Sequence, residues 1–146
     1  MNEFQKCLEQ RRIVKINPTK EMIEKEIYSA EYDLKMADES LVKNDSKWAS
    51  VQAYYSMFHC AKALVLNKGY REKSHYCLIV ALNELYIKTG ELPEEISDDL
   101  ENCMDIRHEA DYGLTYDKES ANLCIDAARS LLESAEKILN KENDNQ

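Results

Sequence analysis

Glycine and proline are scarce in this chain, which has three glycines and two prolines among its 146 residues. A β-sandwich needs turn residues roughly every 8–12 positions, and so few breakers cannot supply them. The glycine-rich motifs GxGxxG and GxxxxGKS/T, which bind nucleotide phosphates, are absent as well. These absences exclude an all-β fold and the usual nucleotide-binding loops, and they leave room for long helices.

Long apolar runs are also missing. No segment approaches the roughly 18 consecutive apolar residues of a membrane-spanning helix. The N-terminal stretch MNEFQKCLEQRR lacks the apolar core of a signal peptide. We therefore expect a cytoplasmic protein with no membrane association.

The cysteines form no CxxC pair and no tight cluster with histidine. Their odd number and wide scatter disfavour a disulfide framework and a structural zinc site. Free cysteines on apolar faces are typical of a reducing compartment. Because the three histidines are far apart and no HExxH or EF-hand motif occurs, we expect no metal and no cofactor. The cysteines are Cys7, Cys60, Cys77, Cys103 and Cys124.

Acidic residues outnumber basic ones, 28 to 19, and the formal net charge is −9. The overall field of such a chain does not attract nucleic acid. Any surface that binds RNA must therefore be a local basic patch, or be completed by a second subunit.

Apolar spacing predicts two long helices in the first half of the chain. The first begins after Pro18 and ends near Asn44, with apolar residues at 4-3-4-3-4 spacing. The second covers about 46–67 and ends before Gly69, as a helix with a C-terminal glycine cap does. It is apolar around much of its circumference. Such a helix is central in its fold or buries a second face against a partner, and on this ground we expect a homodimer.

Three further helices are predicted over about 74–89, 93–112 and 117–139, and the first two end at Gly90 and Gly113. The connections are short, so neighbouring helices should be antiparallel. The sequence thus predicts an all-α protein, an up-and-down bundle of four or five helices.

The predicted organisation is one domain with short flanking segments. Residues 1–16 are expected to form an N-terminal arm, 17–140 a single helical domain, and 141–146 a polar tail.

The fourth predicted helix carries an arginine where its apolar seam should continue. Leu100 and Cys103 lead by four residues to Arg107, and Ala110 then resumes the seam. An inward arginine is costly unless it is paired, and Asp111 lies one turn further on the same face. The polar residues that surround the arginine are His108, Glu109, Asp111 and Tyr112.

Two interpretations of this cluster remain open. One is a salt bridge at the end of a helix, with a solvated outer face. The other is a site that holds a phosphate on Arg107, with Tyr112 or His108 able to move a proton.

A compact basic cluster lies between the second and third predicted helices, and it consists of Lys68, Arg71, Lys73 and His75. In an antiparallel bundle this loop should lie at the same end as the C-terminus of the fourth helix. We expect it to flank Arg107 and to supply local positive charge for RNA or nucleotide. The alternatives are an ordinary solvated loop and, for His75, a polar residue near the start of the third helix.

The second predicted helix carries three further polar aromatic residues. His59 is expected to be packed and hydrogen-bonded. Tyr54 and Tyr55 either pack in the core or bring their hydroxyls near the site, and Tyr55 is retained as a candidate for binding RNA or nucleotide.

Several segments carry a family resemblance. The stretch WASVQAYYSMFHCAKAL from Trp48 to Leu64, the pair Ser74-His75 and the later Arg107-x-x-Ala-Asp-Tyr-Gly resemble HEPN-domain proteins, in particular small single-domain prokaryotic members. The resemblance covers nearly the whole chain. It implies an up-and-down helical bundle that usually dimerises, often as a toxin encoded beside a minimal nucleotidyltransferase that acts as antitoxin.

The resemblance also implies a metal-independent ribonuclease site with an Arg-x4–6-His motif, to which both subunits contribute. Arg107 matches the arginine, but Tyr112, Gly113 and Leu114 stand where the histidine is expected. In the implied mechanism an RNA 2′-OH attacks the adjacent phosphate, a base takes its proton and the arginine stabilises the charge. Arg107 would then bind phosphate and Asp111 would hold Arg107.

Tyr112 would take the place of the missing histidine in proton transfer, with help from His108 or the partner subunit. Because an ordinary tyrosine is a poor base at neutral pH, this role requires a lowered pKa of Tyr112. The missing histidine also motivates an alternative, a non-catalytic helical dimer that binds nucleotide, RNA or a protein partner.

Overall fold

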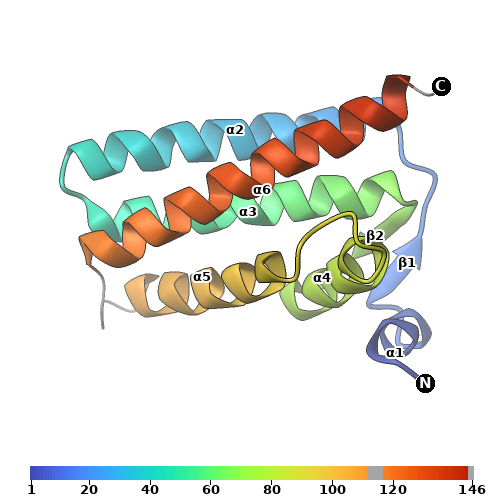
Figure 1. Ribbon diagram of the computed structural model, residues 1–146. Helices are drawn as coiled ribbons and strands as arrows, with labels where there is room; N and C mark the ends of the chain where they lie inside the picture. The colour runs from blue at the N-terminus through green and yellow to red at the C-terminus, as the bar shows by residue number, and fades with distance from the viewer. Residues whose placement is uncertain (112–116, 145–146) are drawn as a thin grey trace.

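The computed structural model describes residues 1–111 and 117–144. Within these ranges most residues are helical and the strands form a single two-stranded ribbon, so the fold is an all-α helical bundle, as the sequence predicts (Figure 1). The elements in chain order are α1 (Glu3–Glu9), β1 (Ile13–Lys15), α2 (Lys20–Val42), α3 (Ser46–Asn67), β2 (Tyr70–Glu72), α4 (His75–Leu82), a π-helical turn η1 (Asn83–Ile87), α5 (Glu95–Asp111) and α6 (Lys118–Asp144).

Side-chain caps and glycines mark the ends of several helices near the predicted boundaries. The side chains of Thr19, Ser74 and Asp117 each accept a hydrogen bond from a backbone N–H in the first turn of α2, α4 and α6. Gly69 and Gly90 follow α3 and η1 with φ values of +89° and +83°, a conformation that glycine adopts without strain. The predicted end at Gly113 lies outside the described residues.

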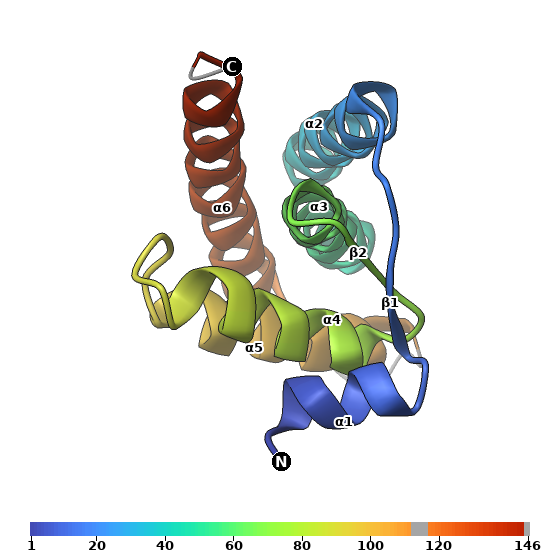
Figure 2. The same ribbon diagram turned by 90° about the vertical axis from the view of Figure 1, so that its right-hand side faces the viewer.

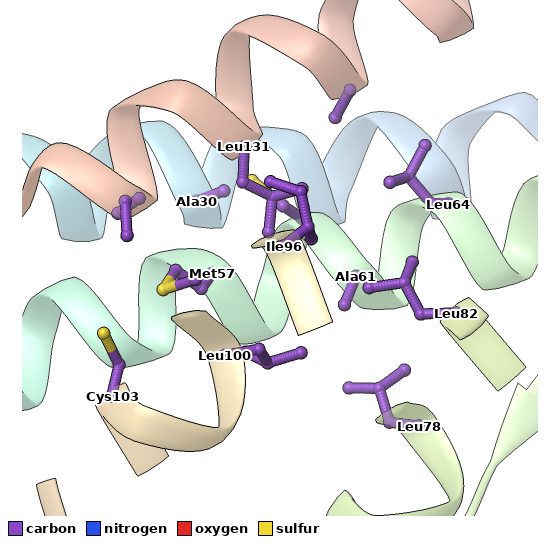
Figure 3. Close-up of a cluster of buried hydrophobic side chains, with 14 of the residues drawn as sticks. Ala30, Met57, Ala61, Leu64, Leu78, Leu82, Ile96, Leu100, Cys103 and Leu131 are labelled. Carbon is purple, nitrogen blue, oxygen red and sulfur yellow. The ribbon is translucent and has the colours of Figure 1, made fainter. Parts of the chain in front are cut away.

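Helix α3 is the centre of the bundle. It lies between α2 and α6 on one side and α4 and α5 on the other (Figure 2). Met57, Ala61 and Leu64 of α3 are fully buried and meet side chains from the four surrounding helices, including Leu100 and Leu131 (Figure 3). The broad apolar surface of α3 is therefore covered within one chain, and it supplies no argument for a dimer.

The first sixteen residues contain a helix and a strand. Phe4 and Cys7 of α1 are buried, and α1 packs against α4 (Figure 2). Strand β1 pairs with β2 in antiparallel register, with Ile13 opposite Glu72 and Lys15 opposite Tyr70. The segment expected to be an arm is thus packed onto the bundle.

The third predicted helix corresponds to α4 continued by the π-helical turn, where the backbone N–H of Lys88 donates to the carbonyl of Asn83 at 2.9 Å. This turn places the Tyr86 ring in the core, where its hydroxyl donates to the carbonyl of Leu64 at 2.6 Å. Leu64 belongs to the last turn of α3, whose carbonyls lack partners within the helix.

We expect the substitution Tyr86→Phe to lower the free energy of unfolding by about 1–2 kcal/mol, because it removes a buried hydrogen bond and leaves a carbonyl in apolar surroundings. Urea unfolding followed by circular dichroism measures this change. Tyr76→Phe is the matched control, since the Tyr76 hydroxyl bonds Glu3 at the surface. Equal losses in both variants would contradict the assignment.

Across the described residues, no helix has both the length and the apolar character needed to cross a membrane. All five cysteines are buried free thiols. Among the side chains of these residues there is no group of three or more His, Cys, Asp and Glu placed to hold a metal ion.

Candidate functional site

The apolar seam of α5 brings Arg107 against the central helix. Ile96, Leu100 and Cys103 are buried from successive turns of α5, and Ala110 is buried beyond them. Arg107 lies on the same face between Cys103 and Ala110 and is half-buried. Since α5 runs antiparallel to α3 (Figure 1), Arg107 meets the N-terminal part of α3.

Two adjacent tyrosines of α3 hold the Arg107 guanidinium. Its Nη2 donates to the Tyr55 hydroxyl at 2.6 Å. The guanidinium carbon lies 5.3 Å from the centroid of the Tyr55 ring and 5.5 Å from that of Tyr54, within the range of cation–π attraction. These contacts fix the orientation of the guanidinium.

One of these tyrosines, Tyr54, connects Arg107 to a histidine on α4. The Tyr54 hydroxyl lies 2.8 Å from Nδ1 of His75, and the Phe58 ring lies 4.6 Å from the His75 ring, centroid to centroid. We call Arg107, Tyr54, Tyr55, Phe58 and His75 the Arg107 cluster. It combines residues from α3, α4 and α5.

Electrostatics define the protonation states of this cluster. Burial lowers the pKa of His75 below its ordinary value of 6.5, and the positive charges of Arg107 and Lys62 add to the effect. His75 is therefore mostly neutral at pH 7. Burial raises the pKa of Tyr54 to about 12, although Arg107 opposes the shift. The Tyr54 phenol stays protonated, so Arg107 is the permanent charge of the cluster.

Comparison with known proteins gives the family. The family model described as HEPN domain matches residues 23–142, which is most of the chain. The chain belongs to the HEPN-domain family. The match includes the whole Arg107 cluster, so the resemblance predicted from the sequence is confirmed.

Curated relatives and a solved structure agree with this assignment. This HEPN protein is 32% identical over 134 residues to "Putative toxin MJ0142" of Methanocaldococcus jannaschii, covering 86% of this chain and 91% of the relative. It is 28% identical over 102 residues to a "UPF0332 protein" of Thermotoga maritima, covering 68% of this chain and 77% of the relative. The crystal structure of TT1696 from Thermus thermophilus has a TM-score of 0.67 at 19% identity and covers 79% of this chain and 96% of that one, a likeness of fold.

The HEPN domain brings together three of the residues that the sequence singled out, namely Arg107, Tyr55 and His75. Tyr54, for which the sequence left packing and site roles open, contacts both Arg107 and His75. Phe58 was not singled out at all. The sequence does carry a signal for the position of Tyr54. Tyr54 lies one turn before Phe58, so the two side chains share a face of α3.

Other candidates lie elsewhere or outside the described residues. Tyr112 falls in the segment 112–116, and the Asp111 side chain is also not described, so the expected pairing of Asp111 with Arg107 lies outside the described residues too. His108 is exposed in the last turn of α5, about 100° around the helix from Arg107.

The expected basic patch is not one surface. Lys68 directly follows α3, thirteen residues after Tyr55 and about 20 Å from it along the helix axis, and its Nζ is 3.3 Å from Glu91. The prediction that the whole loop flanks Arg107 is therefore wrong, because α5 runs antiparallel to α3 and ends at the opposite end. Arg71 and Lys73 are exposed on and just after β2, and their place in an RNA site stays a prediction.

His59 is packed and hydrogen-bonded, as expected. Its Nδ1 is 2.7 Å from Glu26 and its Nε2 is 3.6 Å from Asp33, so two carboxylates of α2 face the ring. Nearby, Lys62 lies 3.6 Å from the buried carboxylate of Glu72. These contacts connect α2, α3 and the ribbon, and they assign His59 a structural role.

The contact between Arg107 and the cluster predicts a measurable coupling. Replacing Arg107 with alanine should raise the pKa of His75 toward 6.5, because it removes a positive charge that opposes protonation. The measurement is an NMR titration of the His75 ring protons. Arg129→Ala is the control, since Arg129 pairs with Asp38 on the surface. An unchanged pKa of His75 in Arg107→Ala would contradict the geometry.

Proposed function

We propose that this HEPN protein is a toxin-type endoribonuclease that cleaves RNA without a metal ion at the Arg107 cluster. The observation that carries the proposal is the orientation of Arg107 by the Tyr55 hydroxyl and two aromatic rings. Membership of the HEPN family supports it, as does the name of the M. jannaschii relative.

The chemistry of the cluster suits a phosphodiester. A guanidinium forms short charge-assisted hydrogen bonds with phosphate oxygens, and it stabilises the extra negative charge of a pentacoordinate phosphorus transition state. The contact with Tyr55 fixes its direction in advance, so little reorganisation is needed when substrate binds. The faces of the Tyr54 and Tyr55 rings contact the Arg107 guanidinium. Stacking on RNA bases is therefore only a secondary role for these two tyrosines.

The motif of this chain is Arg107-x4-Tyr112, where the family pattern has Arg-x4–6-His. Under this proposal Tyr112 orients the substrate or assists proton transfer, Asp111 holds Arg107, and His108 stands beside them. Lys73, Arg71 and His75 would contact the RNA backbone.

The test is cleavage of a mixed-sequence oligoribonucleotide by the purified chain in excess EDTA. We expect fragments that end in a 2′,3′-cyclic phosphate and begin with a 5′-hydroxyl, and no cleavage of an oligonucleotide with 2′-deoxyribose throughout. Tight binding of the RNA without cleavage would overturn the enzymatic proposal and favour a non-catalytic binding module. Cleavage that needs a divalent metal would overturn the metal-independent mechanism.

We also propose two protein partners. A homodimer would complete the site from two subunits, and multi-angle light scattering at micromolar concentration should give twice the chain mass of 17.0 kDa. A monomeric mass would refute the homodimer.

The second proposed partner is a minimal nucleotidyltransferase antitoxin, expected from a neighbouring gene. Co-expression with that protein should relieve growth inhibition, and unrelieved inhibition would count against the pairing.

A further inference from the structure

We propose that His75 is the proton-transfer residue of the Arg107 site, supplied by α4 where the α5 motif lacks a histidine. This inference rests on the proposed ribonuclease function. It follows from the juxtaposition in which Arg107, from α5, and His75, from α4, contact the same residue, Tyr54. One tyrosine side chain thus contacts both the cation and the imidazole.

The surroundings of the three histidines single out His75. His59 faces two carboxylates of α2, with Nδ1 2.7 Å from Glu26 and Nε2 3.6 Å from Asp33. His108 lies on the exposed face of α5, turned away from the Tyr54 and Tyr55 rings. His75 packs against the Tyr54 and Phe58 rings, and the nearby charge of Arg107 contributes to lowering its pKa.

The hydrogen bond with Tyr54 orients the His75 ring for this role. When Nδ1 carries a proton it donates to the Tyr54 oxygen, and Nε2 then has a free lone pair that can accept a proton. The same Nδ1 contact persists after Nε2 is protonated, because the imidazolium also has a proton on Nδ1. Tyr54 is thus a positioning residue, and its neutral phenol accommodates the base before and after proton transfer.

The step balances without any co-reactant. Nε2 of His75 takes the proton of the ribose 2′-OH as O2′ bonds to phosphorus, and Arg107 stabilises the negative oxygens. The bond between phosphorus and O5′ then breaks, and O5′ takes a proton from a water to which the imidazolium gives its own proton. The products are a 2′,3′-cyclic phosphate and a 5′-hydroxyl, and His75 returns to its neutral form.

The electrostatics support a base rather than a second cation. Because burial, Arg107 and Lys62 keep the pKa of His75 below 6.5, its neutral form dominates at pH 7. The cleavage rate should therefore be constant near neutrality and fall below pH 6.5 as His75 becomes protonated. Among the other charged groups near the cluster, the Glu72 carboxylate lies 3.6 Å from Lys62, and burial raises the pKa of Glu72.

The experiment uses the full chain in EDTA with the mixed-sequence oligoribonucleotide. We expect His75→Ala to slow cleavage by about 100-fold or more. The acid limb of the pH–rate profile should disappear, and added imidazole should restore part of the rate. Affinity for the non-cleavable 2′-deoxy oligonucleotide should fall far less than the rate, which separates proton transfer from binding. Tyr54→Phe should retain the acid limb with a lower rate.

His59→Gln is the matched control and should retain the wild-type rate, since His59 contacts α2 carboxylates outside the cluster. Circular dichroism confirms that each variant folds, and His75→Gln replaces His75→Ala if the smaller side chain disrupts α4. Suppose that the wild type cleaves RNA, that Arg107→Ala does not, and that His75→Ala keeps the wild-type rate and acid limb. This result would overturn the role of His75 and leave the ribonuclease function standing. No cleavage by the wild type would overturn both.

Discussion

Arg107→Ala is expected to reduce metal-independent RNA cleavage by about 100-fold or more and to abolish growth inhibition in cells that express the protein. Removing one preorganised donor to an oxyanion costs this much in well-studied enzymes. The guanidinium is also the permanent charge of the cluster, so no other member of the cluster replaces it. Rates with purified protein and colony counts after induction measure the two effects.

Two further variants make this result specific. Arg107→Lys keeps the charge but loses the planar fork of donors, so it should recover only a small part of the rate. Arg129→Ala removes an arginine whose partner, Asp38, is a surface carboxylate at 2.9–3.0 Å, and it should leave toxicity unchanged. Full toxicity of a folded Arg107→Ala protein would reject the proposed site.

The sequence was sufficient to locate Arg107 because a helix seam is a strong local signal. Leu100, Cys103 and Ala110 define a face of α5 by spacing alone, and an arginine in that face stands out. The helix starts at Thr19 and Ser74 and the helix ends before Gly69 and Gly90 were also predictable, because capping depends on residues within one turn.

The contact of both Arg107 and His75 with Tyr54 was harder to predict because it depends on the path of the chain after α3. Residues 68–74 run back along α3, and an extended chain covers about 3.3 Å per residue, whereas a helix rises about 1.5 Å. A few extended residues therefore return His75 to the level of Tyr54, which lies thirteen residues before the end of α3. Strand β2 has only three residues, too few for a period-two pattern to be recognised.

The partner of β2 raises the same difficulty. Strand β1 lies in a segment that looks like an arm, and Ile13 is buried where β1 pairs with β2. Pairing between strands separated by more than fifty residues leaves no local signal. The start of α4 and the position of His75 thus depend on the long-range pairing of β1 with β2. The position of Arg107, in contrast, depends on the local spacing of residues within α5.

Leu100→Ala is expected to lower the free energy of unfolding by about 2–5 kcal/mol, the usual cost of a cavity in a core. Leu100 is 1% exposed and packs in the core cluster of the bundle one turn from Cys103 (Figure 3). Urea unfolding measures the change. Leu123→Ala is the matched control, because Leu123 of α6 is 48% exposed and its loss should cost less than about 0.5 kcal/mol.

The same variant tests how packing supports the site. Arg107 lies two turns after Leu100 on the same face, so a looser α5 should weaken the contact between Arg107 and Tyr55. Leu100→Ala, measured at a temperature where it is still folded, should therefore cleave RNA more slowly and show a His75 pKa shifted toward 6.5, as in Arg107→Ala. A destabilised protein with wild-type cleavage and an unchanged His75 pKa would show that Tyr54 and Tyr55 hold Arg107 without help from the seam. A loss of activity in proportion to the pKa change would show that the core of α5 sets the geometry of the site.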